Sequence, residues 1–533
     1  MSGAVDFSVG YPSWRVPMMG DNAVATSQPL AAQAGLRMLL AGGNAVDAAI
    51  ATAMTLTVVE PTGNGLGSDA FAIVWDGQQL HALNASGRSP AAWSPERFSH
   101  LTKMPEKGWE SVIVPGVVSA WVALAERFGS LPLTTLAQPA IEYARQGFPV
   151  SPLIAHLWQR GYDKLHDQPG FSACFAPQGC VPRAGEIFRN PDLADSLEKI
   201  AATNGETFYR GELAHKIAAF ADEHQAALTL ADLSRHRADW VPTLSRSFAG
   251  GSVHELPPNG QGIATLIALG ILEQWDIGRY VPDSVQWLHL SIEAMKLALA
   301  DLDRYVADAA HMAFPAEKLL CDDYLKQRAA LIDPQQAGDF TFGAPNQSGT
   351  VYLSTADASG MMVSFIQSNY MGFGSGVVVP GTGISLQNRG AGFVLEEGHP
   401  NQVAGGKRAF HTIIPAFALD THGQPLMSFG VMGGPMQAQG HLQMALRIML
   451  HGQNPQAAID APRWRVEQGR RVVVEPSLAR NTLAALRDMG HDVVVEDPLQ
   501  TYSFGGAQVV MRNPHGGYIA ATESRKDGQA LVF

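Results

Sequence analysis

The chain has 533 residues, of which 46% are hydrophobic and 16% are charged. This composition is typical of a densely packed globular protein and excludes a disordered chain, and the length predicts two lobes or one large layered domain. The formal net charge of −12 argues against nucleic acid and against an anionic membrane surface as partners.

Two helices and a hairpin are predicted at the start of the chain. In TSQPLAAQAGLRMLLAGGNAVDAAIATAMTLTVVEP, Thr26 or Ser27 is expected to cap the first helix, and Pro29 suits its first turn. The following GNGLG run leads into two strands joined at residues 76–77. Because this glycine loop enters a strand, the opposite of the dinucleotide-binding order, we interpret it as a turn that needs positive φ and close packing rather than a phosphate cradle.

The middle of the chain is mainly helical and the last third is rich in strands. Residues 116–308 space their apolar side chains at helical intervals, apart from a strand and turn in GGSVHELPPNGQG. After Thr350, VYLSTADASGMMVSFIQS predicts a hairpin closed by residues 358–360, and GGAQVVMRNPHGGYIAATE predicts another. Strands that alternate with blocks of helices indicate stacked sheets covered by helix layers.

The sequence predicts a cytoplasmic protein. The 3 cysteines are an odd, sparse set without a neighbouring histidine cluster, which favours unpaired thiols over a disulfide between Cys174 and Cys180. The first residues, MSGAVDFSVGYPSWRVP, lack the basic start and apolar core of a secretory signal. The most apolar helix, residues 45–61, contains Asp47 and is too short to span a bilayer.

Common hydrolase and metal signatures are missing from the sequence. No serine lies in a Gly-x-Ser-x-Gly frame, His-Glu-x-x-His does not occur, and the 17 histidines show no compact metal-ligand spacing. His289 and His441 lie within apolar helices, so we interpret both as hydrogen-bonded, partly buried side chains. The histidine spacing therefore gives no indication of a metal site.

Thr350 stands where the loose run DFTFGAPNQSG becomes a strand. A threonine hydroxyl is a weak nucleophile, and no base is evident beside it. Cleavage of the chain before the threonine solves this problem, because the new α-amine, with a pKa of about 7.7–8.0, serves as the base for its own hydroxyl. Thr350 suits this role because it begins a strand, follows the small residue Gly349 and is reached by a linker; the alternative is an ordinary strand threonine.

The order of motifs resembles the gamma-glutamyltransferase family over nearly the whole chain. The resemblance lies in AAQAGLRMLLAGGNAVDAAIATAMTLTVVEP, GSDAFAIVWDG, GETFYRGELA, PPNGQG, the hairpin that starts at GTVYLSTADASG, KRAFHTIIPAF, GVMGGPMQAQGH, NPQAAIDAPRW and ESRKDG. It implies an α+β fold, the four-layer αββα sandwich of N-terminal nucleophile hydrolases. It also implies a zymogen that cleaves itself between Gly349 and Thr350 into an associated large fragment, residues 1–349, and small fragment, residues 350–533. By the same resemblance, neither a metal nor an organic cofactor is needed. A dimer of such pairs stays open.

The same resemblance assigns roles at the site. It makes Thr350 the nucleophile that carries the acyl group, and Ser368 the hydroxyl that hydrogen-bonds this nucleophile. Gly433 and Gly434 match the backbone oxyanion hole, where glycines let two N–H groups approach the tetrahedral oxygen without a Cβ in the way. The alternatives are a plain strand serine and a simple glycine turn.

The charged contacts of a gamma-glutamyl group are not where the family has them. The arginine for the α-carboxylate falls near Trp93, although Arg88 lies close by, and the acid for the α-amine falls on Gly392. A zwitterionic glutamyl group needs both charge partners, because desolvating either end unpaired is costly. This departure makes glutathione a doubtful substrate.

We therefore expect hydrolysis, through an acyl-threonine, of a small amide that bears a carboxylate and lacks an α-amine, with oxamate as the leading substrate. The residues expected to bind it are Arg88, Arg389, His411, Thr412 and Tyr370, of which the last three stand at the family's serine pair and asparagine. The alternatives are a bulky glutaryl-type acyl group, as in cephalosporin acylases, a gamma-glutamyltransferase or glutathione hydrolase with other contacts, and, more remotely, an uncleaved binding protein.

Overall fold

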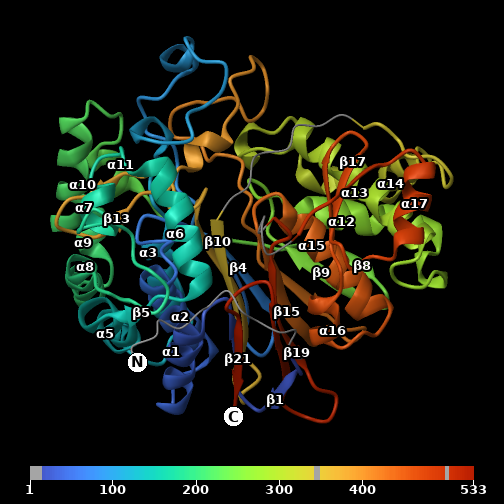
Figure 1. Ribbon diagram of the computed structural model, residues 1–533, viewed down its shortest axis with the longest axis horizontal. Coiled ribbons are helices and arrows are strands. Elements are labelled where there is room, and N and C mark those ends of the chain that lie inside the picture. The colour runs from blue at the N-terminus through green and yellow to red at the C-terminus, as the bar shows by residue number, and fades with distance from the viewer. Residues whose placement is uncertain (1–14, 341–348, 498–502) are drawn as a thin grey trace, which may run out of the picture.

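The computed structural model describes residues 15–340, 349–497 and 503–533. Two seven-stranded sheets lie face to face in the centre of the molecule, and a layer of helices covers the outer face of each (Figure 1). The architecture confirms the predicted α+β fold and its αββα order of layers.

The first sheet contains the strand that begins at the predicted cleavage site. All its strand pairs are antiparallel. The predicted hairpins are present in it, with turns at residues 76–79 and 357–361. In spatial order the strands are β21 (Gln529–Val532), β2 (Ala23–Thr26), β10 (Gly349–Ala356), β11 (Met362–Tyr370), β3 (Asp69–Trp75), β4 (Leu80–Asn84) and β7 (Asp239–Val241).

The second sheet is also antiparallel and packs against the first. The core between the sheets contains side chains from both, among them Phe71, Tyr352 and Phe417. In spatial order the strands are β1 (Met18–Gly20), β20 (Tyr518–Thr522), β19 (Gly506–Arg512), β15 (Pro425–Met432), β14 (Ala416–Leu419), β9 (Gly251–Glu255) and β8 (Leu244–Phe248).

Each sheet buries its outer face under its own helices. The first layer, on the left of Figure 1, comprises α1 (Pro29–Leu40), α2 (Ala45–Val59), α3 (Val117–Phe128), α4 (Leu133–Leu136), α5 (Gln138–Gln146), α6 (Pro152–Leu165), α7 (Phe171–Phe175), α8 (Pro191–Ala202), α9 (Glu206–Tyr209), α10 (Glu212–Glu223) and α11 (Leu230–Arg235). The second layer, on the right, comprises α12 (Gly262–Leu272), α13 (Val285–Tyr305), α14 (Asp322–Ala329), α15 (Met436–Ala445), α16 (Pro455–Asp460) and α17 (Arg480–Asp488).

Short elements complete the chain. Three small sheets are formed by β5 (Phe148–Pro149) with β6 (Ile187–Phe188), β12 (Val378–Val379) with β13 (Ile384–Ser385), and β16 (Trp464–Gln468), β17 (Arg471–Val474) and β18 (Asp492–Val495). The single helical turns are η1 (Pro95–Phe98), η2 (Trp109–Ser111), η3 (Glu273–Trp275), η4 (Ile277–Arg279), η5 (Ala309–His311), η6 (Ala316–Leu320), η7 (Arg389–Gly392) and the π-turn η8 (Leu446–Leu450).

The first helix begins later than the sequence suggests. Its N-cap is Gln28, whose side-chain oxygen accepts hydrogen bonds from the amides of Leu30 and Ala31 at 2.6 and 3.2 Å. The predicted caps are wrong because Thr26 is the last residue of β2 and the Ser27 hydroxyl donates to Glu60 at 2.6 Å. Pro29 occupies the first turn as predicted.

The glycine loop after α2 is needed for close packing, but not for positive φ. A Cβ at Gly67 would lie 2.2 Å from the carbonyl oxygen of Ser385, and one at Gly63 would lie 3.3 Å from the backbone nitrogen of Thr350. None of the three glycines in the run, Gly63, Gly65 and Gly67, is among the positive-φ residues, so that part of the prediction is wrong. The loop therefore lies directly against the predicted nucleophile.

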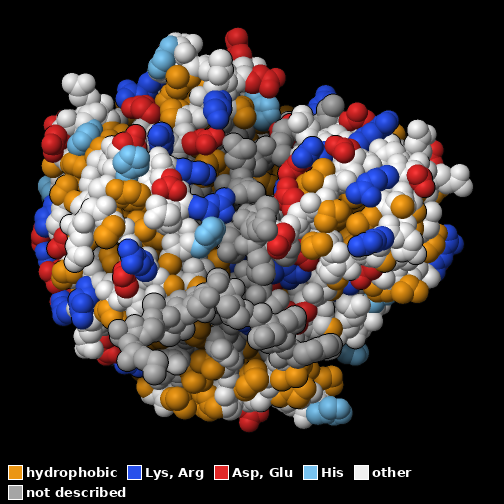
Figure 2. Space-filling model, in the orientation of Figure 1, with side chains coloured by type: hydrophobic (Ala, Val, Ile, Leu, Met, Phe, Trp, Pro, Cys, Tyr) orange, Lys and Arg blue, Asp and Glu red, His pale blue; other side chains and the backbone are white. Residues whose placement is uncertain are grey.

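Surface charge, cysteine pairing and helix hydropathy each bear on a sequence prediction for the described residues. Basic and acidic side chains are interspersed over the face shown in Figure 2, so the charge there is spread rather than gathered. Cys174, Cys180 and Cys321 are unpaired, as predicted. Across the described ranges, every helix is too short or too polar to cross a membrane.

Candidate functional site

Thr350 is buried at the start of β10, at an irregularity in the β10–β11 pairing. Gly349 pairs with Tyr370 and Val351 pairs with Gln367, so one residue of β10 faces two residues of β11. A Cβ at Gly349 would lie 2.9 Å from the Thr62 carbonyl oxygen, which explains why a glycine precedes the threonine. The crowded bulge fixes the Gly349–Thr350 peptide.

Two hydroxyl groups converge on the Gly349 carbonyl oxygen. Thr350 Oγ1 and Ser368 Oγ each lie 2.7 Å from it, and 3.1 Å from one another. The amide of Tyr370 donates to Ser368 Oγ at 2.8 Å. A carbonyl whose oxygen accepts two hydrogen bonds is polarised towards attack at its carbon. Thr350 is the residue expected to attack, because its own backbone nitrogen forms the peptide bond that breaks.

The glycine pair predicted to form the oxyanion hole lies at the same end of the two sheets. Ser354 Oγ lies 3.3 Å from the carbonyl oxygen of Ser428, and the Tyr352 ring packs against Gly430. Two residues nearer the start of β10 is Thr350, and two residues nearer the end of β15 is its last residue, Met432. Thr350 therefore lies opposite the end of β15, which Gly433 and Gly434 directly follow. Their φ values are 122° and 62°, a conformation that favours glycine.

Arg389 is a fully buried cation with unused donors. Its Nη1 donates to Thr412 Oγ1 at 3.0 Å, and its Cζ lies 4.0 Å from the centre of the Tyr370 ring. Its Nε and Nη2 make no hydrogen bond within the described part of the chain. Burial lowers its pKa to about 10, although the negative charge of Asp69 opposes the shift. The guanidinium stays charged at neutral pH and presents unused N–H groups on two nitrogens, which suits a carboxylate.

Asp69 and His411 form a buried pair beside this arginine. The His411 Nδ1 accepts from the amide of Ile413 at 3.3 Å, so Nε2 carries the proton and donates to Asp69 Oδ2 at 3.1 Å. Burial raises the Asp69 pKa to about 7, against the positive charge of Arg389. Burial also lowers the His411 pKa well below its usual range, and Arg389 adds to this effect.

Sequence reasoning assigned no role to Asp69 or Gln261. Asp69 begins the otherwise apolar strand β3 and pairs in register with Ser368 on β11. Gln261 Nε2 donates to the Gly434 carbonyl at 2.8 Å and also to the Thr412 carbonyl, so it connects the glycine pair to the arginine's partner. The available signal for Asp69 was a lone acid at the head of a buried strand.

The two positions predicted to correspond to the family's charged contacts, Trp93 and Gly392, are unsuited to a charged side chain. Trp93 is buried in an apolar cluster with Phe98 and Phe393. A Cβ at Gly392 would lie 2.7 Å from the carbonyl oxygen of Phe410, which leaves no room for an acidic side chain.

Arg88 lies apart from the other predicted binding residues. Its Nη1 is 3.3 Å from Asp308 Oδ2 and from the Gly406 carbonyl, and 46% of its side chain is exposed. It lines a cavity of about 450 Å³ together with Arg235 and His236. The structure therefore brings together Thr350, Ser368, Tyr370, Arg389, His411 and Thr412, and places Arg88 elsewhere.

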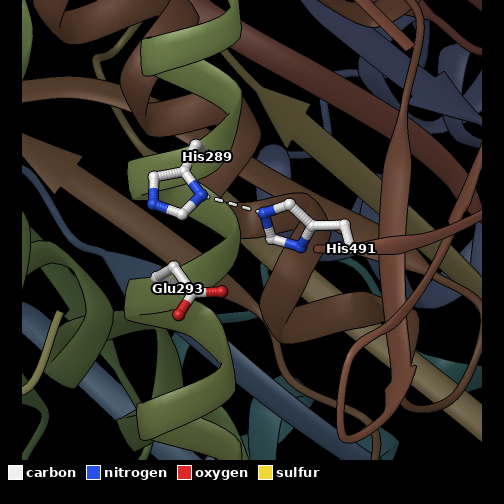
Figure 3. Close-up of side chains that lie close together, drawn as sticks. All are labelled: His289, Glu293 and His491. Carbon is white, nitrogen blue, oxygen red and sulfur yellow. Dashed lines mark hydrogen bonds between the residues drawn. The ribbon is translucent and has the colours of Figure 1, made fainter. Parts of the chain in front are cut away.

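A second buried polar cluster contains His289 (Figure 3). This histidine is hydrogen-bonded as predicted, but it is fully rather than partly buried. Its Nε2 faces the Asp333 carbonyl at 2.8 Å and must carry a proton, so its Nδ1 accepts from His491 Nε2 at 2.9 Å. The His491 Nδ1 then accepts from the Lys296 ammonium at 3.4 Å. Both imidazoles are neutral in this chain of bonds, in keeping with the lowered pKa that burial gives each.

Glu293 completes this second cluster. Its two oxygens accept from Lys296 Nζ at 2.7 Å and from the Gly338 amide at 2.8 Å. The ligand atoms of His289, Glu293 and His491 lie within 4.8 Å of one another, a spacing that suits a metal ion. Each of them is engaged inside the protein, and the lysine ammonium supplies the cation.

Comparison with known proteins gives matches over nearly the full length. The family model described as gamma-glutamyltranspeptidase matches residues 31–533. The glutathione hydrolase-like YwrD proenzyme of Bacillus subtilis is 36% identical over 95% of this chain and 98% of its own length. The oxamate amidohydrolase proenzyme of Klebsiella pneumoniae is 36% identical over 95% and 97%. A solved cephalosporin acylase from Bacillus halodurans is 47% identical and superposes with a TM-score of 0.94, covering 99% of each chain.

Proposed function

The chain belongs to the gamma-glutamyltranspeptidase family, and from this premise we propose that it is a self-processing amide hydrolase for a small amide that bears one carboxylate and no α-amine, with oxamate as the leading substrate. Three observations support this proposal: the arrangement at Thr350, the free donors of Arg389 and the absence of an acid at Gly392.

Self-processing starts from the hydroxyl of Thr350. Its Oγ1 attacks the Gly349 carbonyl carbon while the Ser368 hydroxyl stabilises the oxygen, which lies 2.7 Å away. The peptide C–N bond breaks as the acyl group moves to Oγ1 and the hydroxyl proton passes to the departing Thr350 nitrogen. Water then hydrolyses this ester to a Gly349 carboxylate and regenerates the Thr350 hydroxyl beside its free amine. The fragments stay together because β10 of the small fragment pairs with β2 of the large one.

Turnover reuses the same hydroxyl. The free amine removes its proton, Oγ1 attacks the substrate amide, and the amides of Gly433 and Gly434 stabilise the oxyanion. The amine returns the proton to the leaving nitrogen, which departs as ammonia. Water hydrolyses the acyl-threonine and regenerates the enzyme.

The observation that carries the substrate class is the unsatisfied guanidinium of Arg389. Its Nε and Nη2 are buried donors without partners among the described residues, and an unpaired buried donor is costly. A substrate carboxylate satisfies both at once in the bidentate geometry that arginine favours. The arginine then selects anionic acyl groups.

An α-amine on the acyl group has no good partner. Gly392 has no room for an acid. The nearby Asp69 already accepts from His411 and from the Gly87 amide at 3.0 Å, and its raised pKa weakens it as a counter-ion for an ammonium. This environment disfavours a gamma-glutamyl group.

A glutaryl-type acyl group is the second candidate, because the similarity to the cephalosporin acylase reaches 47% identity. Both candidates use Arg389 for the terminal carboxylate and differ in the length of the acyl chain between this carboxylate and the reacting carbonyl.

The test measures ammonia release by the purified, cleaved protein from the half-amides oxamate, malonamate, succinamate and glutaramate. Highest kcat/KM for oxamate is the expected result, and a maximum at glutaramate selects the glutaryl-type alternative. A gamma-glutamyl anilide is assayed beside them. Activity on the anilide alone contradicts the proposal.

A further inference from the structure

Tyr370, the last residue of β11, has a strained backbone. Its φ is +81°, in the left-handed region that bulky side chains rarely adopt. The residue is buried and contacts both halves of the site. Strain of this kind persists only where the surroundings enforce it, and it occurs often at functional sites.

The backbone end of Tyr370 acts on the nucleophile. Its amide donates to Ser368 Oγ at 2.8 Å, so the serine accepts there and is left with its own proton to donate. The Gly349 carbonyl lies 2.7 Å from that serine oxygen and can only accept. The Tyr370 amide thus sets the direction in which the Ser368 hydroxyl points.

The ring end of Tyr370 acts on the anion site. The Arg389 guanidinium lies over the ring face, with 4.0 Å between its Cζ and the ring centre. The ring holds the cation without using any of its N–H donors, unlike a carboxylate partner, which would occupy them. Nε and Nη2 are left open for a ligand, and only Nη1 is anchored, by Thr412.

We propose that Tyr370 is a positioning residue whose left-handed backbone orients the Ser368 hydroxyl and whose ring holds Arg389 open for the acyl carboxylate. The part that concerns the ring rests on the proposed function, whereas the part that concerns the backbone does not. The two parts predict different defects, because a substitution can remove the ring and keep the backbone conformation.

Tyr370→Asn separates the two parts, since asparagine tolerates the left-handed conformation and has no aromatic face. We expect self-cleavage within about threefold of the wild type and, because a desolvated cation–π contact is lost, a KM for oxamate raised about 10- to 30-fold. The KM for pyruvamide, a neutral amide of similar size, should stay unchanged. Tyr370→Phe, which keeps the ring, should have a KM for oxamate close to that of the wild type.

Tyr370→Val tests the backbone, since a β-branched residue resists positive φ. We expect slower self-cleavage, followed by denaturing electrophoresis in freshly refolded precursor, with circular dichroism to confirm the fold. Equal rises in KM for oxamate and pyruvamide in the asparagine variant overturn the role of the ring. Wild-type cleavage by the valine variant overturns the role of the backbone. A wild-type protein inactive on oxamate refutes the proposed function and still allows the cleavage assay to decide the backbone part.

Discussion

The two buried polar clusters of this protein differ in what they leave unsatisfied. Around His289, both imidazoles, Glu293 and Lys296 are joined in one directed chain of hydrogen bonds, of which Figure 3 draws the one between His289 and His491. Around Arg389, one nitrogen is anchored and two are left without partners among the described residues. A closed cluster stabilises the fold, whereas an open one keeps binding capacity for a ligand.

Burial alone therefore does not identify a site. Lys296 and Arg389 are both fully buried cations whose pKa burial lowers. Lys296 has Glu293 at 2.7 Å as its counter-ion, while Arg389 rests on an aromatic ring. The closed cluster also joins the two predicted fragments: α13 and residues 333–338 belong to the large fragment, and His491 belongs to the small one.

The largest expected effect comes from removing the hydroxyl beside the open cluster. Thr350→Ala should abolish both self-cleavage and amide hydrolysis, because no other group supplies the nucleophile, whereas Thr350→Ser should retain slow cleavage. Denaturing electrophoresis and ammonia release give the readout. Hydrolysis at the wild-type rate by the alanine variant would show that the nucleophile lies elsewhere.

Breaking the closed cluster should change stability and leave catalysis intact. Lys296→Met leaves Glu293 buried without its cation, so the free energy of unfolding should fall by about 3–5 kcal/mol. The double variant with Glu293→Gln removes both charges and should recover part of this loss. Urea unfolding measures the stability, and kcat/KM is measured on the folded fraction. A large fall in kcat/KM of the folded fraction would show that the closed cluster contributes to catalysis.

The pH dependence of binding should reflect Asp69. Its pKa is raised to about 7, so it is mostly neutral below pH 7 and becomes anionic above it. An anionic Asp69 competes with the substrate carboxylate for Arg389, and KM for oxamate should rise by less than about tenfold between pH 6 and 8. The pKa of His411 lies too low for it to titrate there, and Arg389 stays charged.

The control for this pH effect is Asp69→Asn, in which the ratio of the KM values for oxamate and pyruvamide should no longer depend on pH. A ratio that changes with pH as strongly in the asparagine variant assigns the titration to another group.

The raised pKa of Asp69 also affects folding stability. Asp69 contributes stability at low pH that is lost as pH rises through about 7.

The smallest effect is expected at Arg88. The side chain is nearly half exposed and pairs with Asp308, and exposed ion pairs contribute about 0–1 kcal/mol. Arg88→Ala should change KM for oxamate by less than about fivefold. A fall of about 100-fold in kcat/KM for oxamate, the loss expected for Arg389→Met, would show that Arg88 binds the acyl carboxylate.

The sequence was sufficient for the layers and for the hairpin that carries Thr350, because helical spacing of apolar side chains and strand runs closed by glycine turns are local signals. The cap of α1 was not predicted, because glutamine is an unusual N-cap and the serine beside it binds Glu60 instead.

Asp69 escaped notice for a different reason. Its importance depends on its register with Ser368 and on an arginine far along the chain, and neither relation is local. The two candidate arginines likewise looked equivalent in the sequence. Their difference is burial: Arg389 is fully buried, whereas the Arg88 side chain is nearly half exposed.

The most direct measurement compares kcat/KM for oxamate and pyruvamide in the wild type and in Arg389→Met. The variant keeps a long apolar side chain and removes the charge, so kcat/KM for oxamate should fall about 100-fold or more while that for pyruvamide changes little. An equal fall for both substrates, or no fall for oxamate, would contradict the claim that the open guanidinium binds the acyl carboxylate.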